Sequence, residues 1–103
     1  MKLNLQKQGH LMRLSNESIK SVLNYIIDTQ TFDFDDGKMS TLYITTIVNE
    51  LSDDNEYKMQ EIACAIVRCI NEGFILSNYP RNVWATAEVF DVTLRGFEWL
   101  ENN

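Results

Sequence analysis

The sequence is poor in the residues on which catalytic and metal-binding sites depend. It contains a single histidine, His10, and two cysteines, Cys64 and Cys69. Ser/His/Asp and Cys/His catalytic arrangements need a positioned histidine, and His10 lies in a weakly patterned N-terminal stretch. Neither a spacing typical of zinc ligands nor a glycine-rich phosphate-binding pattern occurs. We therefore expect a protein that is not an enzyme and that binds no metal and no cofactor.

Long apolar runs and a secretion signal are also missing. No segment reaches the roughly 20 consecutive apolar residues that span a bilayer, and residues 1–6 lack the apolar core of a signal peptide. Cys64 and Cys69 lie five positions apart on one predicted helix, so they point in different directions and cannot form a disulfide with each other. These features predict a cytoplasmic protein without a membrane partner.

Basic residues are scarce, with nine Lys and Arg against 15 Asp and Glu and a net charge of −6. Residues 28–61 hold nine acidic and two basic residues, whereas residues 1–20 hold four basic residues and one acidic residue. Asp33, Asp35 and Asp36 lack the continuation of a calcium-binding loop, and we interpret them as a solvated turn. Because nucleic-acid binding relies on Lys and Arg to neutralise phosphates, this balance favours a protein partner.

Apolar periodicity predicts four helices in the remainder of the chain. The first follows Ser15 as N-cap, ends near Thr29 and carries one apolar stripe, formed by Ile19, Val22, Leu23, Ile26 and Ile27. A short second helix capped by Thr45 or Thr46 follows, then a third over residues 56–72 that Gly73 ends, and a last one over residues 93–102. Residues 1–14 are expected to form an extended arm.

Three strands are expected between the helices, over residues 39–44, 74–77 and 83–92, and the turn between the last two contains Pro80. The element order is then helix, strand, helix, helix, strand, strand, helix. This order predicts an α+β fold, a single winged helix-turn-helix domain over residues 15–103 with four helices. Its small antiparallel sheet would combine the strand before the second helix with the hairpin called the wing.

Three runs of the chain resemble a known family: residues 42–52 (LYITTIVNELS), residues 59–75, which end in INEGFI, and residues 90–100 (FDVTLRGFEWL). They are similar to the winged-helix domain-of-unknown-function family 2513, whose members are often encoded by prophages and mobile elements of low-GC Gram-positive bacteria. The family often has Tyr-His where this chain has Cys64-Ala65, and Gly-His where it has Gly96-Phe97. The resemblance implies the fold and a phage or mobile-element origin, and it carries no activity.

Two surfaces are candidates for partner binding. In a winged helix the third helix enters the major groove of DNA and the wing contacts its backbone. The candidate DNA contacts are Lys58, Gln60, Arg68, Asn71 and Arg81. The candidate contacts to a protein partner are Asp53, Asp54, Glu56, Glu61, Tyr79 and Trp84. Trp84 could serve as an interface anchor, or it could instead pack across the sheet on Trp99 or Phe97.

Two functional hypotheses remain open at this point. The first is a non-catalytic binding module of phage or mobile-element type that occupies a basic protein partner, for example an anti-CRISPR or another anti-defence inhibitor. The alternative is a small transcriptional regulator that binds DNA as a dimer. Residues 1–14 or the terminal helix could pair two copies of the chain.

Overall fold

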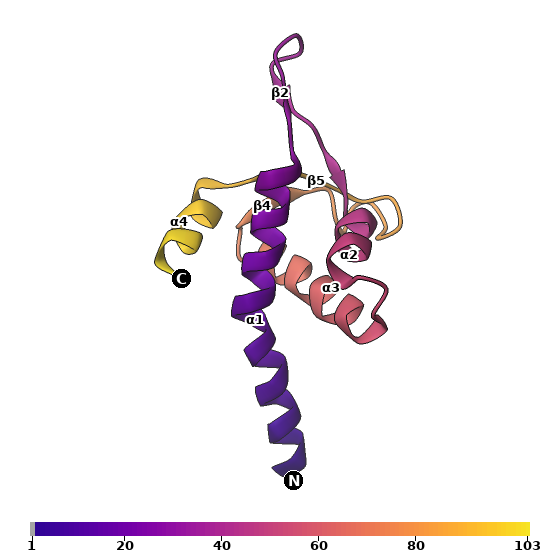
Figure 1. The fold of residues 1–103 in the computed structure, drawn as a ribbon, viewed down its shortest axis with the longest axis vertical. Helices are drawn as coiled ribbons and strands as arrows, with labels where there is room; N and C mark the ends of the chain where they lie inside the picture. The colour runs from indigo at the N-terminus through magenta and orange to yellow at the C-terminus, as the bar shows by residue number, and fades with distance from the viewer. Residues whose placement is uncertain (1) are drawn as a thin grey trace.

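A computed structural model describes residues 2–103, with side chains described from residue 16 onward. The described part is an α+β fold of four helices and two small antiparallel sheets (Figure 1). In chain order the elements are α1 (Lys2–Thr29), β1 (Phe32–Asp33), β2 (Lys38–Met39), β3 (Leu42–Tyr43), α2 (Ile44–Ser52), α3 (Glu56–Asn71), β4 (Ile75–Ser77), β5 (Glu88–Val92) and α4 (Leu94–Asn102). None of the described helices combines the length and the apolar character needed to cross a bilayer.

The larger sheet has the strand order β3–β5–β4, and both pairings are antiparallel. The strand before α2 therefore joins the β4–β5 hairpin, as the sequence predicts. The prediction that the last strand begins at residue 83 is wrong, because β5 begins at Glu88. The preceding residues fold into turns, with the amide of Thr86 donating to the carbonyl of Val83 over 3.0 Å.

A second sheet, the β1–β2 hairpin, was not predicted. The single strand expected over residues 39–44 is instead divided between β2 and β3, which belong to different sheets. Ser40 and Thr41 separate the two strands. The Ser40 amide donates to the Thr31 carbonyl over 2.8 Å, and its hydroxyl accepts from the Thr31 amide over 3.0 Å. These bonds close the base of the hairpin, which projects beyond the end of α1 in Figure 1.

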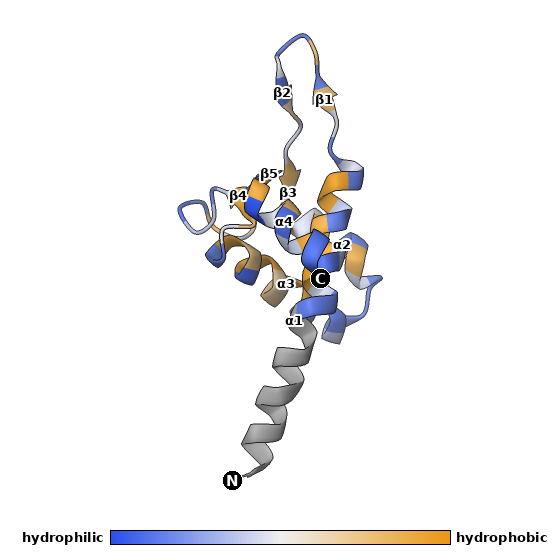
Figure 2. Ribbon diagram, turned by 90° about the vertical axis from the view of Figure 1, so that its left-hand side faces the viewer, coloured by the Kyte–Doolittle hydropathy of each residue, from blue (hydrophilic) through white to orange (hydrophobic). Residues whose placement is uncertain are grey.

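The core lies where α1, α2 and α3 pack together under one face of the larger sheet. In Figure 2 hydrophobic residues concentrate where these elements meet. The stripe predicted on α1 is largely confirmed, because four of its five members are buried and the fifth, Ile27, is partly buried. The buried residues of α3 are Ile62, Ala65, Ile66 and Cys69. Burial of the two isoleucines, Ile62 and Ile66, stabilises the fold by roughly 1.5–3 kcal/mol each relative to an exposed position.

Local signals fix the ends of α3 and α4. Asn55 caps α3 by accepting a hydrogen bond from the Lys58 amide over 3.0 Å, and Thr93 caps α4 by accepting from the Gly96 amide over 3.1 Å. Gly73, just after α3, has a φ of +79°, a left-handed conformation that favours glycine.

Neither Thr45 nor Thr46 caps α2, which begins at Ile44. Its N-cap is Tyr43, whose side chain makes no capping bond. The amide of Ile44 donates instead to the carbonyl of Ala87 over 3.0 Å. Because β3 runs directly into α2, the chain entering β5 satisfies a donor that a side chain would otherwise have to satisfy.

The arm expected over residues 1–14 lies outside the residues whose side chains are described. Its backbone from Lys2 belongs to α1, so an extended conformation and an N-cap at Ser15 were both wrong. This stretch is rich in Leu, Gln and Lys, which favour helices, and the alternation of Leu3 and Leu5 was too short to oppose them. A role for this segment in pairing two copies stays a prediction.

Candidate functional site

All four candidate DNA contacts expected on α3 are exposed: Lys58, Gln60, Arg68 and Asn71. Gln60, Arg68 and Asn71 share one face of the helix with the exposed Cys64, opposite the buried residues that pack on the core. Lys58 lies on the side of the buried residues, and it is exposed at the N-terminal end of the helix. The fifth candidate, Arg81, is exposed in the connection between β4 and β5.

The N-terminal end of α3 is strongly acidic. Asp53, Asp54 and Glu56 are all exposed around the Asn55 cap. Asp53 and Asp54 have left-handed φ angles of 53° and 62°, which Asp tolerates better than most residues. Within the described part of the chain, no basic side chain forms an ion pair with these three carboxylates. We call Asp53, Asp54 and Glu56 the acidic end of α3.

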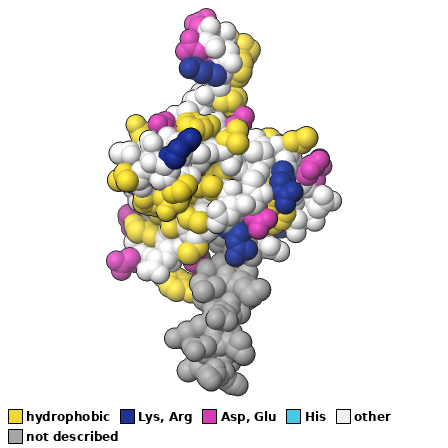
Figure 3. Space-filling model, turned by 180° about the vertical axis from the view of Figure 1, so that it is seen from behind, with side chains coloured by type: hydrophobic (Ala, Val, Ile, Leu, Met, Phe, Trp, Pro, Cys, Tyr) yellow, Lys and Arg dark blue, Asp and Glu magenta, His cyan; other side chains and the backbone are white. Residues whose placement is uncertain are grey.

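The C-terminal half of α3 borders a groove with a volume of about 530 Å³. The residues that line it are Ala63, Cys64, Val67, Arg68, Asn71 and Trp84. We call this the Trp84 groove. Figure 3 shows the molecule from the side opposite to Figure 1, with hydrophobic side chains gathered in a broad patch and separate basic side chains around it.

Trp84 does not pack on Trp99 or Phe97, as one sequence interpretation expected. Its ring instead contacts Tyr79 edge to face, with centroids 5.2 Å apart and planes at 83°, while Trp99 packs on Phe74 at 5.6 Å. The physical reason is the late start of β5, which leaves Trp84 in the turns before the strand instead of on the sheet. The two aromatic residues predicted as protein contacts, Tyr79 and Trp84, therefore lie together.

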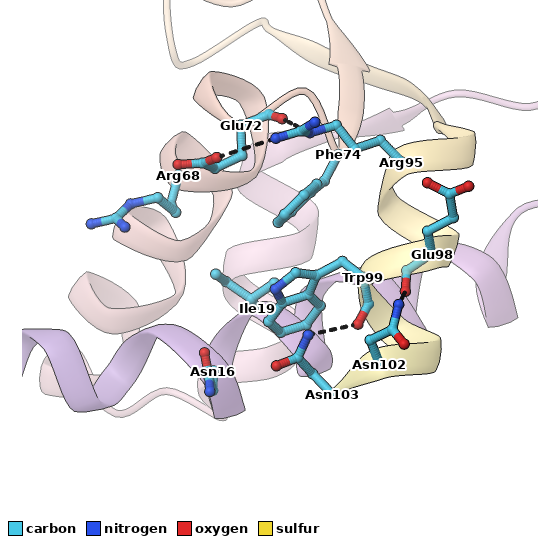
Figure 4. A pocket seen from close by; sticks show the side chains of 10 residues that line it. All are labelled: Asn16, Ile19, Arg68, Glu72, Phe74, Arg95, Glu98, Trp99, Asn102 and Asn103. Carbon is cyan, nitrogen blue, oxygen red and sulfur yellow. Dashed lines mark hydrogen bonds and ion pairs between the residues drawn. The ribbon is translucent and has the colours of Figure 1, made fainter.

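A second hollow of about 410 Å³ lies between α1, α3 and α4, next to Phe74 and Trp99 (Figure 4). The exposed side chain of Arg95 lines this hollow and is bonded to Glu72: its Nε donates to the Glu72 carbonyl over 2.7 Å, and its Nη2 lies 3.9 Å from Glu72 Oε1. The Arg95 Cζ atom also lies 6.0 Å from the centroid of the Phe74 ring. Figure 4 shows Arg68 at the rim of this hollow, directed away from Trp99. Sequence reasoning missed this hollow, because it joins three helices that are distant in the sequence.

The reactive groups of the described residues are dispersed. Burial raises the pKa of the Cys69 thiol from 9.0 to about 12, which keeps it protonated and unreactive at neutral pH. Asp33 Oδ1 accepts hydrogen bonds from the amides of Asp35 and Asp36 over 2.8 and 3.2 Å, so this carboxylate stabilises its own turn. Within the described range, no three His, Cys, Asp or Glu side chains come together as a metal site.

The structure divides the sequence-predicted residues into two groups along α3. Arg68 and Asn71 meet Trp84 in the groove, so candidate DNA contacts and a candidate protein contact share one hollow. The acidic end lies at the other end of the helix. Glu56 is roughly 16 Å from Val67 along the helix axis, at a rise of about 1.5 Å per residue. Of the remaining candidates, Lys58 and Gln60 lie between the two groups, and Glu61 is partly buried.

Comparison with protein-family models, with curated proteins and with solved structures found no match for this chain. The resemblance to the winged-helix family therefore stays a hypothesis that rests on the three sequence runs.

Proposed function

We propose that this protein is a non-catalytic winged-helix module that acts by binding a basic protein partner. The pairing of β3 with the β4–β5 hairpin and the short polar connection between α2 and α3 support the winged helix-turn-helix assignment. In that assignment α3 is the recognition helix and the β4–β5 connection is the wing.

The observation that carries the choice of a protein partner is the acidic end of α3. In helix-turn-helix proteins the N-terminal residues of the recognition helix contact the bases, close to the phosphates of the groove. A helix N-terminus ordinarily attracts phosphate, but here Asp53, Asp54 and Glu56 surround it with exposed carboxylates. These charges repel DNA and complement a surface rich in Lys and Arg.

A concrete form of this function is an inhibitor from a phage or mobile element that covers the nucleic-acid-binding surface of a host protein. An anti-CRISPR or another anti-defence factor has this task. Surfaces that bind nucleic acid are basic, so an acidic module with a net charge of −6 is attracted to them.

The test compares two variants that each lose three negative charges. The first is Asp53→Asn, Asp54→Asn and Glu56→Gln, in which Asn tolerates the left-handed backbone. The matched control, Glu17→Gln, Glu98→Gln and Glu101→Gln, removes exposed carboxylates from α1 and α4. With an immobilised oligolysine peptide as the probe, we expect the first variant to lose more affinity than the control. Equal losses would show that only net charge matters and would overturn the assignment to this surface.

The alternative function is a dimeric DNA-binding regulator, which the shared exposed face of Gln60, Arg68 and Asn71 favours. Such side chains can hydrogen-bond base edges. Fluorescence anisotropy with a mixed-sequence duplex at low and high salt separates the two proposals. Salt-sensitive binding, with Arg81→Ala weakening all sequences and Arg68→Ala abolishing specific binding, would favour the regulator. An absence of binding at low salt would favour the protein-binding module.

A further inference from the structure

The β1–β2 hairpin is the most exposed element of the described structure. All residues from 31 to 38 are exposed, and Phe34 at the tip is 88% exposed. The Phe34 ring packs edge to face on Phe32, with centroids 5.0 Å apart, but neither ring reaches the core. In Figure 3 acidic and hydrophobic side chains lie together at the projecting tip. An exposed aromatic pair of this kind is typical of a contact surface.

The hairpin is held in a defined conformation. The amide of Gly37 donates to the carbonyl of Asp33 over 2.7 Å, and Gly37 has a left-handed φ of +69°. At the base, Gln30 Nε2 donates to the carbonyl oxygens of Ser40 and Phe90 over 2.6 and 2.9 Å. The tip is therefore presented by a fixed turn and a fixed base, which lowers the conformational entropy lost on binding.

The Trp84 groove has the complementary properties. Its volume of about 530 Å³ accommodates an aromatic ring, and Val67 and Trp84 supply apolar contacts. Trp84 packs edge to face on Tyr79, which supports its ring at the wall of the groove. Arg68 supplies a positive charge that no described carboxylate neutralises in an ion pair.

We infer that the groove receives the hairpin tip of a second copy of this chain. Phe34 enters between Val67 and Trp84, while Asp35 and Asp36 beside it approach Arg68. Size, apolar character and charge match on both sides of this contact. It uses the C-terminal half of α3 and leaves the acidic end free, so it stands independently of the proposed function.

The first experiment is site-directed crosslinking that uses the native cysteines. With oxidised glutathione as the electron acceptor, Asp35→Cys keeps the Phe34 anchor and is expected to form a disulfide with Cys64 of a second chain, which gives a dimer on a non-reducing gel. Buried Cys69 does not compete. The matched control combines Asp35→Cys with Cys64→Ser, and it should remain monomeric. A dimer that persists in this control would show collision between tips and would overturn the inference.

The second experiment measures association by sedimentation equilibrium over a concentration series. Phe34→Ala is expected to raise the dissociation constant at least about tenfold, because aromatic anchors dominate interfaces. The control Leu94→Ala removes another largely exposed apolar side chain, from α4, and should leave the constant unchanged. A wild-type protein that is monomeric at every concentration would overturn the inference. So would an association that Phe34→Ala does not affect.

A charge exchange tests the orientation of the contact. Arg68→Glu is expected to weaken association, and the added changes Asp35→Lys and Asp36→Lys should restore it, because the attractive pairs are then re-formed with opposite signs. A failure of restoration in a folded triple variant, as judged by circular dichroism, would overturn the placement of the tip beside Arg68.

Discussion

At the residue scale, Gly96 marks the point where α4 comes closest to the chain leading into β4. A Cβ atom built on Gly96 would lie 2.5 Å from the Phe74 carbonyl oxygen and 2.8 Å from Val92 Cγ1. The Phe74 carbonyl accepts a hydrogen bond from the Thr93 amide over 2.9 Å, so it cannot move without breaking the connection to α4. Only glycine fits this crossing.

Gly96→Ala is therefore expected to lower the free energy of unfolding by about 1–3 kcal/mol, the usual cost of overpacking. Urea denaturation measures the change, with Glu98→Ala as a control at an exposed position of the same helix. Alanine is otherwise the better helix former by about 1 kcal/mol. Unchanged or increased stability would show that α4 does not approach this closely.

The two cysteines are expected to differ sharply in reactivity. Cys64 is exposed on α3, whereas burial of Cys69 raises its pKa to about 12. Iodoacetamide at neutral pH should modify one thiol per native chain and two per chain in denaturant, because the thiolate is the nucleophile. Mass spectrometry of the modified peptides would identify the site, and modification of native Cys69 would contradict its burial.

The same thiol predicts a loss of stability in alkali. The folded pKa of Cys69 lies above its unfolded value of 9.0, so its contribution is fully present below pH 9.0 and is lost as pH rises toward about 12. Within this window the unfolded state releases a proton that the folded state retains, which lowers the free energy of unfolding by at most about 1.4 kcal/mol per pH unit. Denaturation across the window should show a shallower decline for Cys69→Ala than for Cys64→Ala.

At the element scale, Gln30 fixes the hairpin to the rest of the fold. Gln30→Ala leaves the carbonyl oxygens of Ser40 and Phe90 without this donor, and we expect a loss of about 1–3 kcal/mol. Hydrogen exchange at the amides of Gly37 and Ser40 should become faster, because both belong to the hairpin. Thr31→Ala, at an exposed neighbouring position, serves as the control. Unchanged exchange would show that the backbone bonds hold the hairpin alone.

Sequence reasoning succeeded where short-range chemistry defines an element. Asn55, Gly73 and Thr93 act through bonds or backbone angles within a few residues, and they place the ends of α3 and α4 within a residue of the prediction. The apolar stripe of α1 was likewise read from spacing alone. Such signals need no knowledge of distant contacts.

The elements that were not predicted from the sequence depend on long-range contacts or on very short strand pairings. The β1–β2 hairpin has two residue pairs, too few for an alternating pattern, and its base depends on Gln30 bonding to Phe90, 60 residues away. The Trp84 groove was not predicted either, because its formation depends on where the β4–β5 connection ends and β5 begins. Arg68 and Asn71 were predicted as DNA contacts on α3, but their meeting with Trp84 was not predicted.

At the scale of the whole molecule, acidic side chains outnumber basic ones, and few of them form ion pairs within the described residues. The net charge is −6, and the ion pair between Arg95 and Glu72 is the one formed within the described residues. Like charges destabilise the compact state through mutual repulsion, and salt screens it. Added sodium chloride should therefore raise the melting temperature.

The neutralised variant Asp53→Asn, Asp54→Asn and Glu56→Gln should show a smaller response to salt than the wild type, since part of the repulsion is already removed. A scan at several salt concentrations measures both slopes. A melting temperature that falls with salt would instead show that attractive pairs outweigh repulsion in the folded chain.

The attachment of the hairpin through Gln30 also has a mechanical consequence. One amide group bonds both the base of the hairpin and β5, the central strand between β3 and β4. A displacement of the hairpin base is therefore passed on in two directions, to α1 through the backbone and to β5 through the Gln30 side chain. Because β5 follows directly from the turns that carry Trp84, the second direction leads from the hairpin toward the wall of the groove.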